Sequence, residues 1–265
     1  MNSLMSINFK FMEFSPEELI EITKDNKYMD GFEIYIDVDK PEEVEYLHKL
    51  VDTCKLHNKI LQIHGNSSLP MDKQKAFCDM VMKISDILGY RISLVLHSLT
   101  DDGKNVAIEE TDAYMKEITD YIDTNKIRIG LENLNDMEFL DRLDKDEITP
   151  IVCNNERLFF TYDVGHEIAD YGNVTNIIDA MVDQMSNVHI HTFDDKYDDG
   201  YDHKPIYKDD EHWQNIIKAI LFLKNKNYQG NIVFEYDVME CIGNTLKDKI
   251  KNYADSMDYV AERFK

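Results

Sequence analysis

Basic residues are scarce in this sequence of 265 residues, in which 29 lysines and arginines face 52 aspartates and glutamates, for a formal net charge of −23. Proteins that bind nucleic acid usually carry a basic surface that neutralises phosphates. The charge therefore disfavours nucleic acid as a partner, and it disfavours an anionic membrane surface for the same reason. The sequence also lacks any run approaching the roughly 20 apolar residues that span a bilayer, so we expect no membrane association.

Cysteine is equally sparse, with four residues spaced far apart and no CxxC pair: Cys54, Cys78, Cys153 and Cys241. This spacing excludes a dense disulfide framework and a structural zinc finger, and it is typical of a reduced compartment. The first residues show no basic stretch followed by an apolar core, so we expect no secretory signal. The sequence predicts a cytoplasmic protein.

Glycine (10 residues) and proline (5 residues) are too few to form a flexible linker, and no low-complexity run interrupts the chain. Hydrophobic residues make up 43% of the sequence, which is enough to bury a core despite the charge. We therefore expect one domain over residues 1–265.

Short apolar, β-branched runs alternate with longer amphipathic stretches along the chain. The eight predicted strands are Ser6–Phe11, Gly31–Asp37, Lys59–Gly65, Arg91–Ser98, Arg128–Leu134, Leu158–His166, Asn187–Asp194 and Gly230–Asp237. The predicted helices begin at Ser15-Pro16 and at Pro41, or span Met71–Leu88, Val106–Ile122, Val174–Met185, Trp213–Leu223 and Leu246–Phe264. Buried strands that alternate with helices favour an α/β fold of the (β/α)8 TIM-barrel type, with an open doubly wound sheet as the alternative.

Polar residues of the kinds that bind metals follow six consecutive predicted strands. They are His64, His97, Glu132, Asp163 with His166, His189 with His191, and Glu235. The chemistry of a (β/α)8 barrel takes place at the carboxyl ends of its strands, where these residues fall. Converging carboxylates repel one another unless a cation lies between them, and imidazole and carboxylate donors suit Zn, Mn, Co or Mg.

The sequence leaves two possible roles open for each of two further polar residues. His189 is in phase with His191 along its strand, so it either supports the site from behind or packs in the core. Glu33 lies on the second strand, where it either reaches the underside of the barrel mouth or ends in a salt bridge. We assign neither residue to the site.

The motifs from Lys59 to Asp237 resemble those of the xylose-isomerase-like TIM-barrel superfamily, which holds sugar isomerases and epimerases together with family 2 AP endonucleases. The matching motifs are Gly130-Leu131-Glu132-Asn133, Asp163-Val164-Gly165-His166, His191-Thr192-Phe193-Asp194, Asp202-His203-Lys204-Pro205 and Glu235. In the epimerase branch the matching residues bind one divalent metal, which implies Glu132, Asp163, His191 and Glu235 as its ligands here.

The resemblance also implies roles in catalysis. Glu132 and Glu235 would be the acid/base pair that moves a proton next to a polarised carbonyl, giving isomerisation or epimerisation through an enediolate. His166 would bind a substrate oxygen, and we assign His64, His97 and His203 to substrate binding as well.

A zinc-dependent phosphodiesterase of the AP-endonuclease type is the first alternative, since that branch binds three zinc ions with histidines that resemble His64, His97, His166 and His203. This sequence departs from that branch at Tyr201, where the branch has an aspartate, and it lacks the glycines that follow the histidine aligned with His203. Two or three Zn would replace the single metal under this interpretation. A barrel that binds a metal or metabolite without turnover is the second alternative.

Charge separates the two enzymatic interpretations. The loops after the strands read Thr100-Asp101-Asp102, Asn135-Asp136 and Asp194-Asp195-Lys196-Tyr197-Asp198-Asp199, which favours a small sugar-like substrate over DNA. The loop after Glu235 is acidic, and Lys196 and Lys204 are the cations nearest to His191 and His203 in sequence, so we expect a neutral keto-sugar or polyol. Assembly into a homo-oligomer is left open.

Overall fold

The computed structural model describes residues 1–66, 68–101, 104–105, 108–133, 155–168, 171–194, 201–207 and 212–265. Eight strands pair in the order β1-β12-β9-β8-β7-β4-β3-β2 and form a closed barrel, as predicted. Their bounds are β1 Asn2–Ile7, β2 Gly31–Ile36, β3 Ile60–Gly65, β4 Ile92–Leu96, β7 Ile127–Glu132, β8 Leu158–Asp163, β9 Met185–Ile190 and β12 Asn231–Phe234. The open doubly wound sheet is thereby excluded.

Helices follow the strands along the chain. They are α1 Pro16–Ile22, α2 Pro41–Leu56, α3 Met71–Leu88, α4 Ile108–Tyr121, α7 Tyr171–Met181, α8 Trp213–Asn225 and α9 Leu246–Ala261, with short 3-10 turns η1 Phe9–Glu13, η2 Gly165–Glu167, η3 Val182–Gln184 and η4 Val238–Glu240. Two small antiparallel sheets pair β5 Thr100–Asp101 with β6 Lys104–Asn105, and β10 Thr192–Asp194 with β11 Tyr201–Lys204. Among the described residues, no helix combines the length and the apolar character that crossing a membrane requires.

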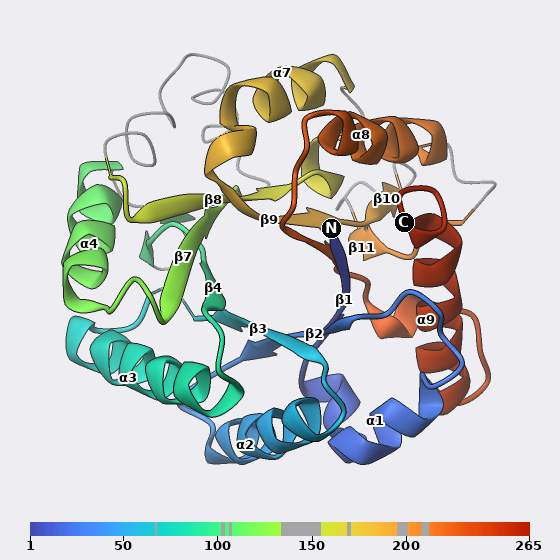
Figure 1. Cartoon of the computed structure of the whole chain (residues 1–265), viewed down its shortest axis with the longest axis horizontal. Helices are drawn as coiled ribbons and strands as arrows, with labels where there is room; N and C mark the ends of the chain where they lie inside the picture. The colour runs from blue at the N-terminus through green and yellow to red at the C-terminus, as the bar shows by residue number, and fades with distance from the viewer. Residues whose placement is uncertain are drawn as a thin grey trace. The chain divides into compact units, whose positions relative to one another are not determined.

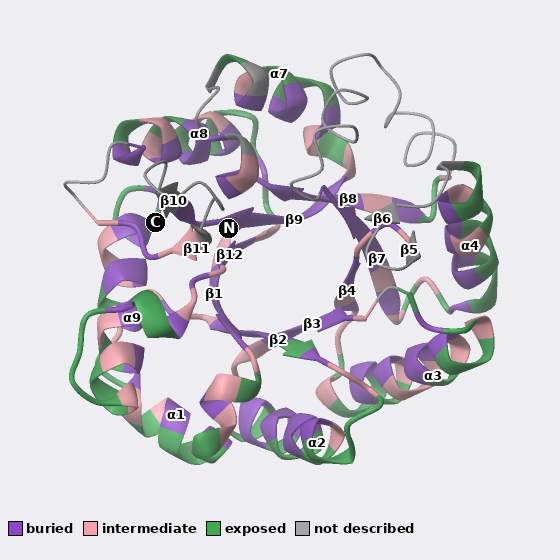
Figure 2. Cartoon of the chain, turned by 180° about the vertical axis from the view of Figure 1, so that it is seen from behind, coloured by how far each residue is buried: buried purple, intermediate pink, exposed green. Residues whose placement is uncertain are grey.

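The chain divides into two compact units. The first comprises residues 1–33, 163–183 and 187–265, and the second comprises residues 34–162 and 184–186. Within the second unit, α2 and α3 lie side by side outside β3 (Figure 1). Both helices carry buried and exposed bands, as their amphipathic sequences require (Figure 2). One domain over residues 1–265 stays a prediction.

The first strand begins and ends earlier than its sequence pattern indicates. The prediction of a strand over Ser6–Phe11 is wrong at its second half, because β1 ends at Ile7 and Phe9–Glu13 forms η1. The side chain of Asn8 accepts a hydrogen bond from the backbone N–H of Lys10 (3.0 Å) and so begins the turn. Phe11 is then fully buried while Phe9 is 61% exposed, which imitates the alternation of a strand.

The predicted start of α1 is confirmed in detail. Ser15 caps the helix by accepting from the backbone N–H of Glu18 (3.3 Å), and the Glu18 carboxylate accepts from the Ser15 N–H (2.8 Å). Pro16 occupies the first turn, where its missing N–H costs nothing. Thr245 and Asp248 form the same reciprocal cap at the start of α9, which the sequence pattern did not single out.

Tyr253 ties α9 to the two strands that it covers in the first unit. Its buried hydroxyl accepts from the backbone N–H of Tyr236 (3.0 Å) and faces the carbonyl oxygens of Ser6 (3.1 Å) and Phe234. Burial raises the pKa of this phenol well above its usual value, so the hydroxyl keeps its proton. A single side chain therefore contacts backbone groups of β1, of β12 and of the residues just after β12.

Replacing Tyr253 with phenylalanine leaves these backbone groups buried without their partner, so we expect the free energy of unfolding to fall by about 1 to 3 kcal/mol. Urea denaturation followed by circular dichroism measures the change. Tyr259→Phe on the same helix is the matched control, because its ring stacks on Trp213 and phenylalanine preserves that contact. Equal stability of Tyr253→Phe and the wild type would contradict the role given to the hydroxyl.

The described cysteines are free thiols inside the protein. Burial raises the pKa of Cys54, Cys78 and Cys241 to about 12 in each case. We expect iodoacetamide at pH 8 to leave these three thiols unmodified in the native protein and to alkylate them after unfolding in guanidinium, since the thiolate is the reactive form. Peptide mass spectrometry assigns the modified residues, and alkylation of any of the three before unfolding would be the contrary result. Cys153 lies outside the described residues.

Candidate metal centre and buried acid–histidine network

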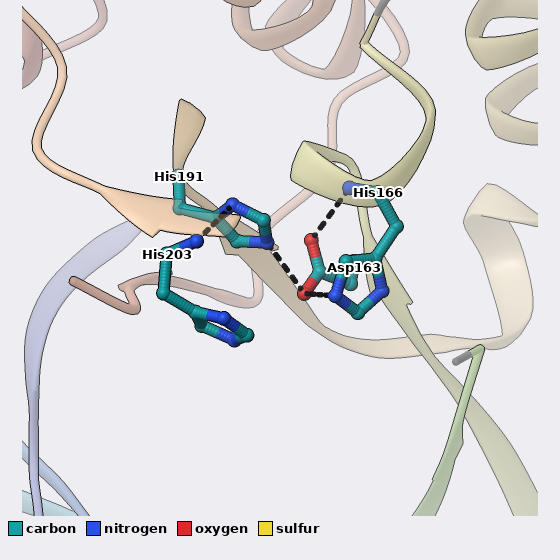
Figure 3. Close-up of side chains that lie close together, drawn as sticks. All are labelled: Asp163, His166, His191 and His203. Atoms are coloured by element: carbon teal, nitrogen blue, oxygen red, sulfur yellow. Dashed lines mark hydrogen bonds and ion pairs between the residues drawn. The ribbon is translucent and has the colours of Figure 1, made fainter. Parts of the chain in front are cut away.

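Asp163 is the centre of the polar cluster in the first unit. It ends β8, its side chain is fully buried, and its Oδ1 accepts from the backbone N–H groups of Gly165 (2.7 Å) and His166 (3.3 Å). These two bonds turn the chain into η2 and explain why the predicted strand to His166 stops at Asp163. The other oxygen, Oδ2, lies 3.1 Å from Nε2 of His191 and 3.3 Å from Nε2 of His166 (Figure 3).

His191 and His203 approach Asp163 from a second part of this unit. His191 lies between β9 and β10, and its Nδ1 accepts from the backbone N–H of His203 (3.1 Å) on β11. The Nε2 atom of the same ring faces Asp163. The rings of His191 and His203 stack with centroids 4.3 Å apart, and His203 holds a left-handed φ of 59°.

These four side chains have the chemistry of a metal site. Asp163, His166, His191 and His203 each offer one ligand atom, and these atoms lie within 4.8 Å of one another. The set combines imidazole nitrogens with a carboxylate oxygen, which are donors that zinc, manganese and cobalt accept. The residues therefore fit a divalent transition metal.

The charge of Asp163 depends on its neighbours. Burial alone would raise its pKa, but the positive charges of His166 and His191 and the hydrogen bond from His191 outweigh burial and lower the pKa below its usual value. The negative charge of Glu235 acts in the opposite direction and raises the pKa of Asp163. Two carboxylates thus share one small region, where a cation would relieve their repulsion.

Glu235 follows β12, and its backbone N–H donates to the carbonyl of Ile190 (3.1 Å). Its Oε2 lies 2.9 Å from Nδ1 of His189 and 3.6 Å from Nε2 of His203. Burial would raise the pKa of Glu235, but the charges and hydrogen bonds of His189 and His203 lower it well below its usual value. Glu235 is therefore a carboxylate at neutral pH.

Glu33 is a member of this network that the sequence analysis left unassigned. It lies on β2, is fully buried, and places Oε2 at 3.1 Å from Nε2 of His189. The signal was present in the sequence, because a charged residue inside a buried apolar run requires a partner. The contact of Glu33 with His189 is compatible with the salt-bridge interpretation, and the choice between the two interpretations stays open.

A second cluster belongs to the second unit. His64 and His97 face each other with their Nε2 atoms 2.9 Å apart, and Oε2 of Glu132 lies 3.2 Å from Nε2 of His97 and 3.5 Å from that of His64. His64 and Glu132 are both only 2% exposed, and the edge of the Tyr35 ring packs against His64. The three residues offer ligand atoms within 4.8 Å of one another.

The predicted site residues divide between the two units. Asp163, His166, His191, His203 and Glu235 gather in the first unit, and His64, His97 and Glu132 gather in the second. The predicted ligand quartet draws on both units, so it stays a prediction. Several residues named from the sequence lie outside the described residues: Asp102, Asn135, Asp136, residues 195–200 and the side chain of Asp202.

Comparison with known proteins places the chain in a family. The sequence model of the xylose isomerase-like TIM barrel family matches residues 28–263, whereas no curated protein sequence matches the chain. Solved structures with a similar fold include 3-keto-D-glucoside 4-epimerase YcjR from E. coli, with a TM-score of 0.66, 13% identity and 99% of both chains covered.

Two further structures show the same fold. D-psicose 3-epimerase with D-tagatose from Clostridium cellulolyticum H10 aligns with a TM-score of 0.64 and 15% identity, over 98% of this chain and 97% of that chain. The IolI protein with a bound zinc atom aligns with a TM-score of 0.66 and 16% identity, over 100% of this chain and 99% of that chain. Because the family model covers most of the sequence, the chain belongs to the xylose isomerase-like TIM barrel family.

Proposed function

We propose that this protein is a divalent-metal-dependent isomerase or epimerase that acts on a sugar or sugar-like keto or polyol substrate. The observation that carries the proposal is the pairing of the buried carboxylate of Asp163 and the part-buried carboxylate of Glu235 with histidine nitrogens in one compact unit. Membership of a family whose fold is shared with sugar epimerases supports the same reaction class.

Asp163, His191 and Glu235 would hold the metal, with Glu132 as the fourth ligand that the sequence motif implies. A divalent ion at this position supplies Lewis acidity, which polarises a substrate carbonyl and acidifies the neighbouring C–H bond. The single Mn, Co, Mg or Zn ion proposed from the sequence is compatible with this mixed nitrogen and oxygen set, and the fold is shared with a protein that binds zinc.

We propose that Glu235 and Glu132 carry out the proton transfer. Glu235 is the proposed acceptor of the proton from carbon, and contacts with His189 and His203 hold its carboxylate in place. Glu132 is proposed as the partner that returns a proton, and Nε2 of His97 at 3.2 Å is placed to exchange a proton with it. His166 and His203 would donate hydrogen bonds to substrate oxygens, and we propose the same role for His64 and His97.

A neutral substrate is favoured by the charges that follow β12. Asp237 comes two residues after Glu235, and both of its oxygens lie 2.8 Å from the Nζ of Lys10. This lysine is therefore already neutralised, and the position after β12 offers an acid where a phosphate would need donors. We propose a keto-sugar or polyol without a phosphate group.

Zinc-dependent phosphodiester cleavage of the AP-endonuclease type is the second candidate. It is favoured by the His64, His97 and Glu132 cluster, because this cluster adds a second set of ligand atoms to the one around Asp163. The net charge of −23 opposes it, since a duplex would be repelled.

We expect protein stripped with a chelator to regain activity with one Mn, Co, Mg or Zn ion per chain. The assay incubates a panel of unphosphorylated ketoses in D2O and follows deuterium entry at the carbon next to the carbonyl by NMR, because proton transfer exchanges that hydrogen with solvent. Glu235→Gln should abolish exchange, whereas Glu240→Gln on the exposed turn η4 is the matched control and should retain it.

Other outcomes of this experiment would refute the proposal. Two or three zinc ions per chain, together with chelator-sensitive incision of a duplex containing an abasic site, would assign the phosphodiesterase. Metal binding without exchange on any ketose or cleavage of any duplex would assign a binding protein. Turnover of phosphorylated sugars alone would contradict the neutral substrate.

Gly165 provides a test of the metal centre that changes none of the proposed ligand residues. A Cβ at this position would lie 2.5 to 2.6 Å from three atoms of the His191 ring, so the ring would have to shift. We expect Gly165→Ala to weaken Mn²⁺ binding by about tenfold or more, measured by isothermal titration calorimetry.

Gly89→Ala is the control for this variant. Gly89 caps α3 with a left-handed φ of 78° and has open space around its Cα, so alanine there should cost stability of about 1 kcal/mol without altering metal affinity. Equal Mn²⁺ affinity of Gly165→Ala and the wild type would show that His191 does not ligate the metal.

A further inference from the structure

We propose that Glu33 is a positioning residue that acts through His189 on Glu235, and so sets the metal affinity of the proposed site. This inference rests on the proposed function, because it concerns how one of the proposed ligands is held. The three residues come from β2, β9 and the residue that follows β12, all within the first unit.

The three side chains form a continuous chain of contacts. Oε2 of Glu33 lies 3.1 Å from Nε2 of His189, and Nδ1 of the same ring lies 2.9 Å from Oε2 of Glu235. Glu33 and His189 are both fully buried, whereas the side chain of Glu235 is 16% exposed. The contacts therefore connect the buried Glu33 to Glu235, which is a proposed metal ligand.

Glu33 is itself held in place. Ser6 on β1 donates from Oγ to Oε1 of Glu33 at 3.4 Å, while Oε2 of Glu33 faces His189. The carboxylate is thus engaged on both oxygens, and its position on a strand allows little movement. A rigid anchor of this kind determines the plane of the imidazole that it contacts.

The contacts of His189 explain why its ring transmits that orientation. Each of its two nitrogens faces a carboxylate oxygen, so the ring is fixed at both ends and cannot rotate without losing one contact. Oε2 of Glu235 is consequently held on the side of His189, and the direction in which Glu235 presents its carboxylate follows from Glu33. Residues behind a metal ligand commonly change metal affinity or activity by 10- to 100-fold.

A purely structural salt bridge between Glu33 and His189 is the competing interpretation. It predicts that loss of Glu33 lowers stability and leaves the metal site unchanged. The positioning role predicts that the environment of a bound metal changes even when the protein remains folded, so a spectroscopic probe of the metal distinguishes the two.

The experiment titrates chelator-treated full-length protein with Co²⁺ and records both the affinity and the visible absorption spectrum. We expect Glu33→Gln, which keeps the shape of the side chain and removes its charge, to weaken Co²⁺ binding by about 10- to 100-fold and to shift the absorption bands. Leu223→Ala, in the buried face of α8, is the control for a general loss of stability in the first unit. It should lower the melting temperature and leave the affinity and the spectrum unchanged.

A double-mutant cycle tests the path through His189. If Glu33 acts by way of this ring, Glu33→Gln should have little further effect on Co²⁺ affinity in a His189→Gln background. Additive effects of the two substitutions would overturn the path. If Glu33→Gln does not fold, Glu33→Asp replaces it, because aspartate keeps the charge and shortens the reach to His189; we expect weaker Co²⁺ binding and a shifted spectrum.

The outcomes separate this inference from the proposed function. Wild-type protein that fails to bind Co²⁺ would overturn the metal-dependent function and the inference with it. Wild-type protein that binds Co²⁺, together with a folded Glu33 variant of identical affinity and spectrum, would overturn the inference alone and leave Glu33 as a structural salt bridge.

Discussion

The burial of carboxylates beside histidines is the interaction on which the proposed site depends. Asp163 is fully buried at the end of β8, where an isolated charge would be expensive. Two backbone N–H groups satisfy one of its oxygens, and nitrogens of His166 and His191 face the other. The bonds from the two N–H groups also end β8 and begin η2. The Asp163 carboxylate therefore fixes the backbone turn as well as contacting the histidines of the site.

Most of the fold could be predicted from the sequence because strands buried on both faces leave a strong local signal. The runs that became β3, β4 and β8 consist of apolar residues bounded by polar ones, and the amphipathic stretches between them have helical period. The prediction failed at β1, where Phe9 and Phe11 imitate strand alternation. There, the Asn8 side chain accepts a hydrogen bond from the Lys10 N–H at the start of η1, and no periodic pattern reveals such a bond.

Several residues of the candidate site could be named from the sequence, but their contacts with one another could not. Position at strand ends identified Asp163, His191 and Glu235, since parallel strands place their carboxyl ends together. His203 joins them because β11 pairs with β10, and His203 itself has a left-handed φ. This pairing depends on the folded structure and leaves no local signal in the sequence. Glu33 was left without a role because its partner, His189, is 156 residues away in sequence, and only the fold brings the two together.

The choice of histidine as the partner of these acids explains how the site remains competent for a metal. A lysine beside Asp163 or Glu235 would remain a cation and would exclude a divalent ion from the same space. Histidine stabilises the carboxylate as an imidazolium or a neutral donor, and it releases its proton when a metal takes the nitrogen lone pair. Several lysines instead pair with acids at the surface, as Lys73 does with Asp39. Lysines thus pair with acids outside the site, whereas exchangeable protons surround Asp163 and Glu235, where a metal would replace them.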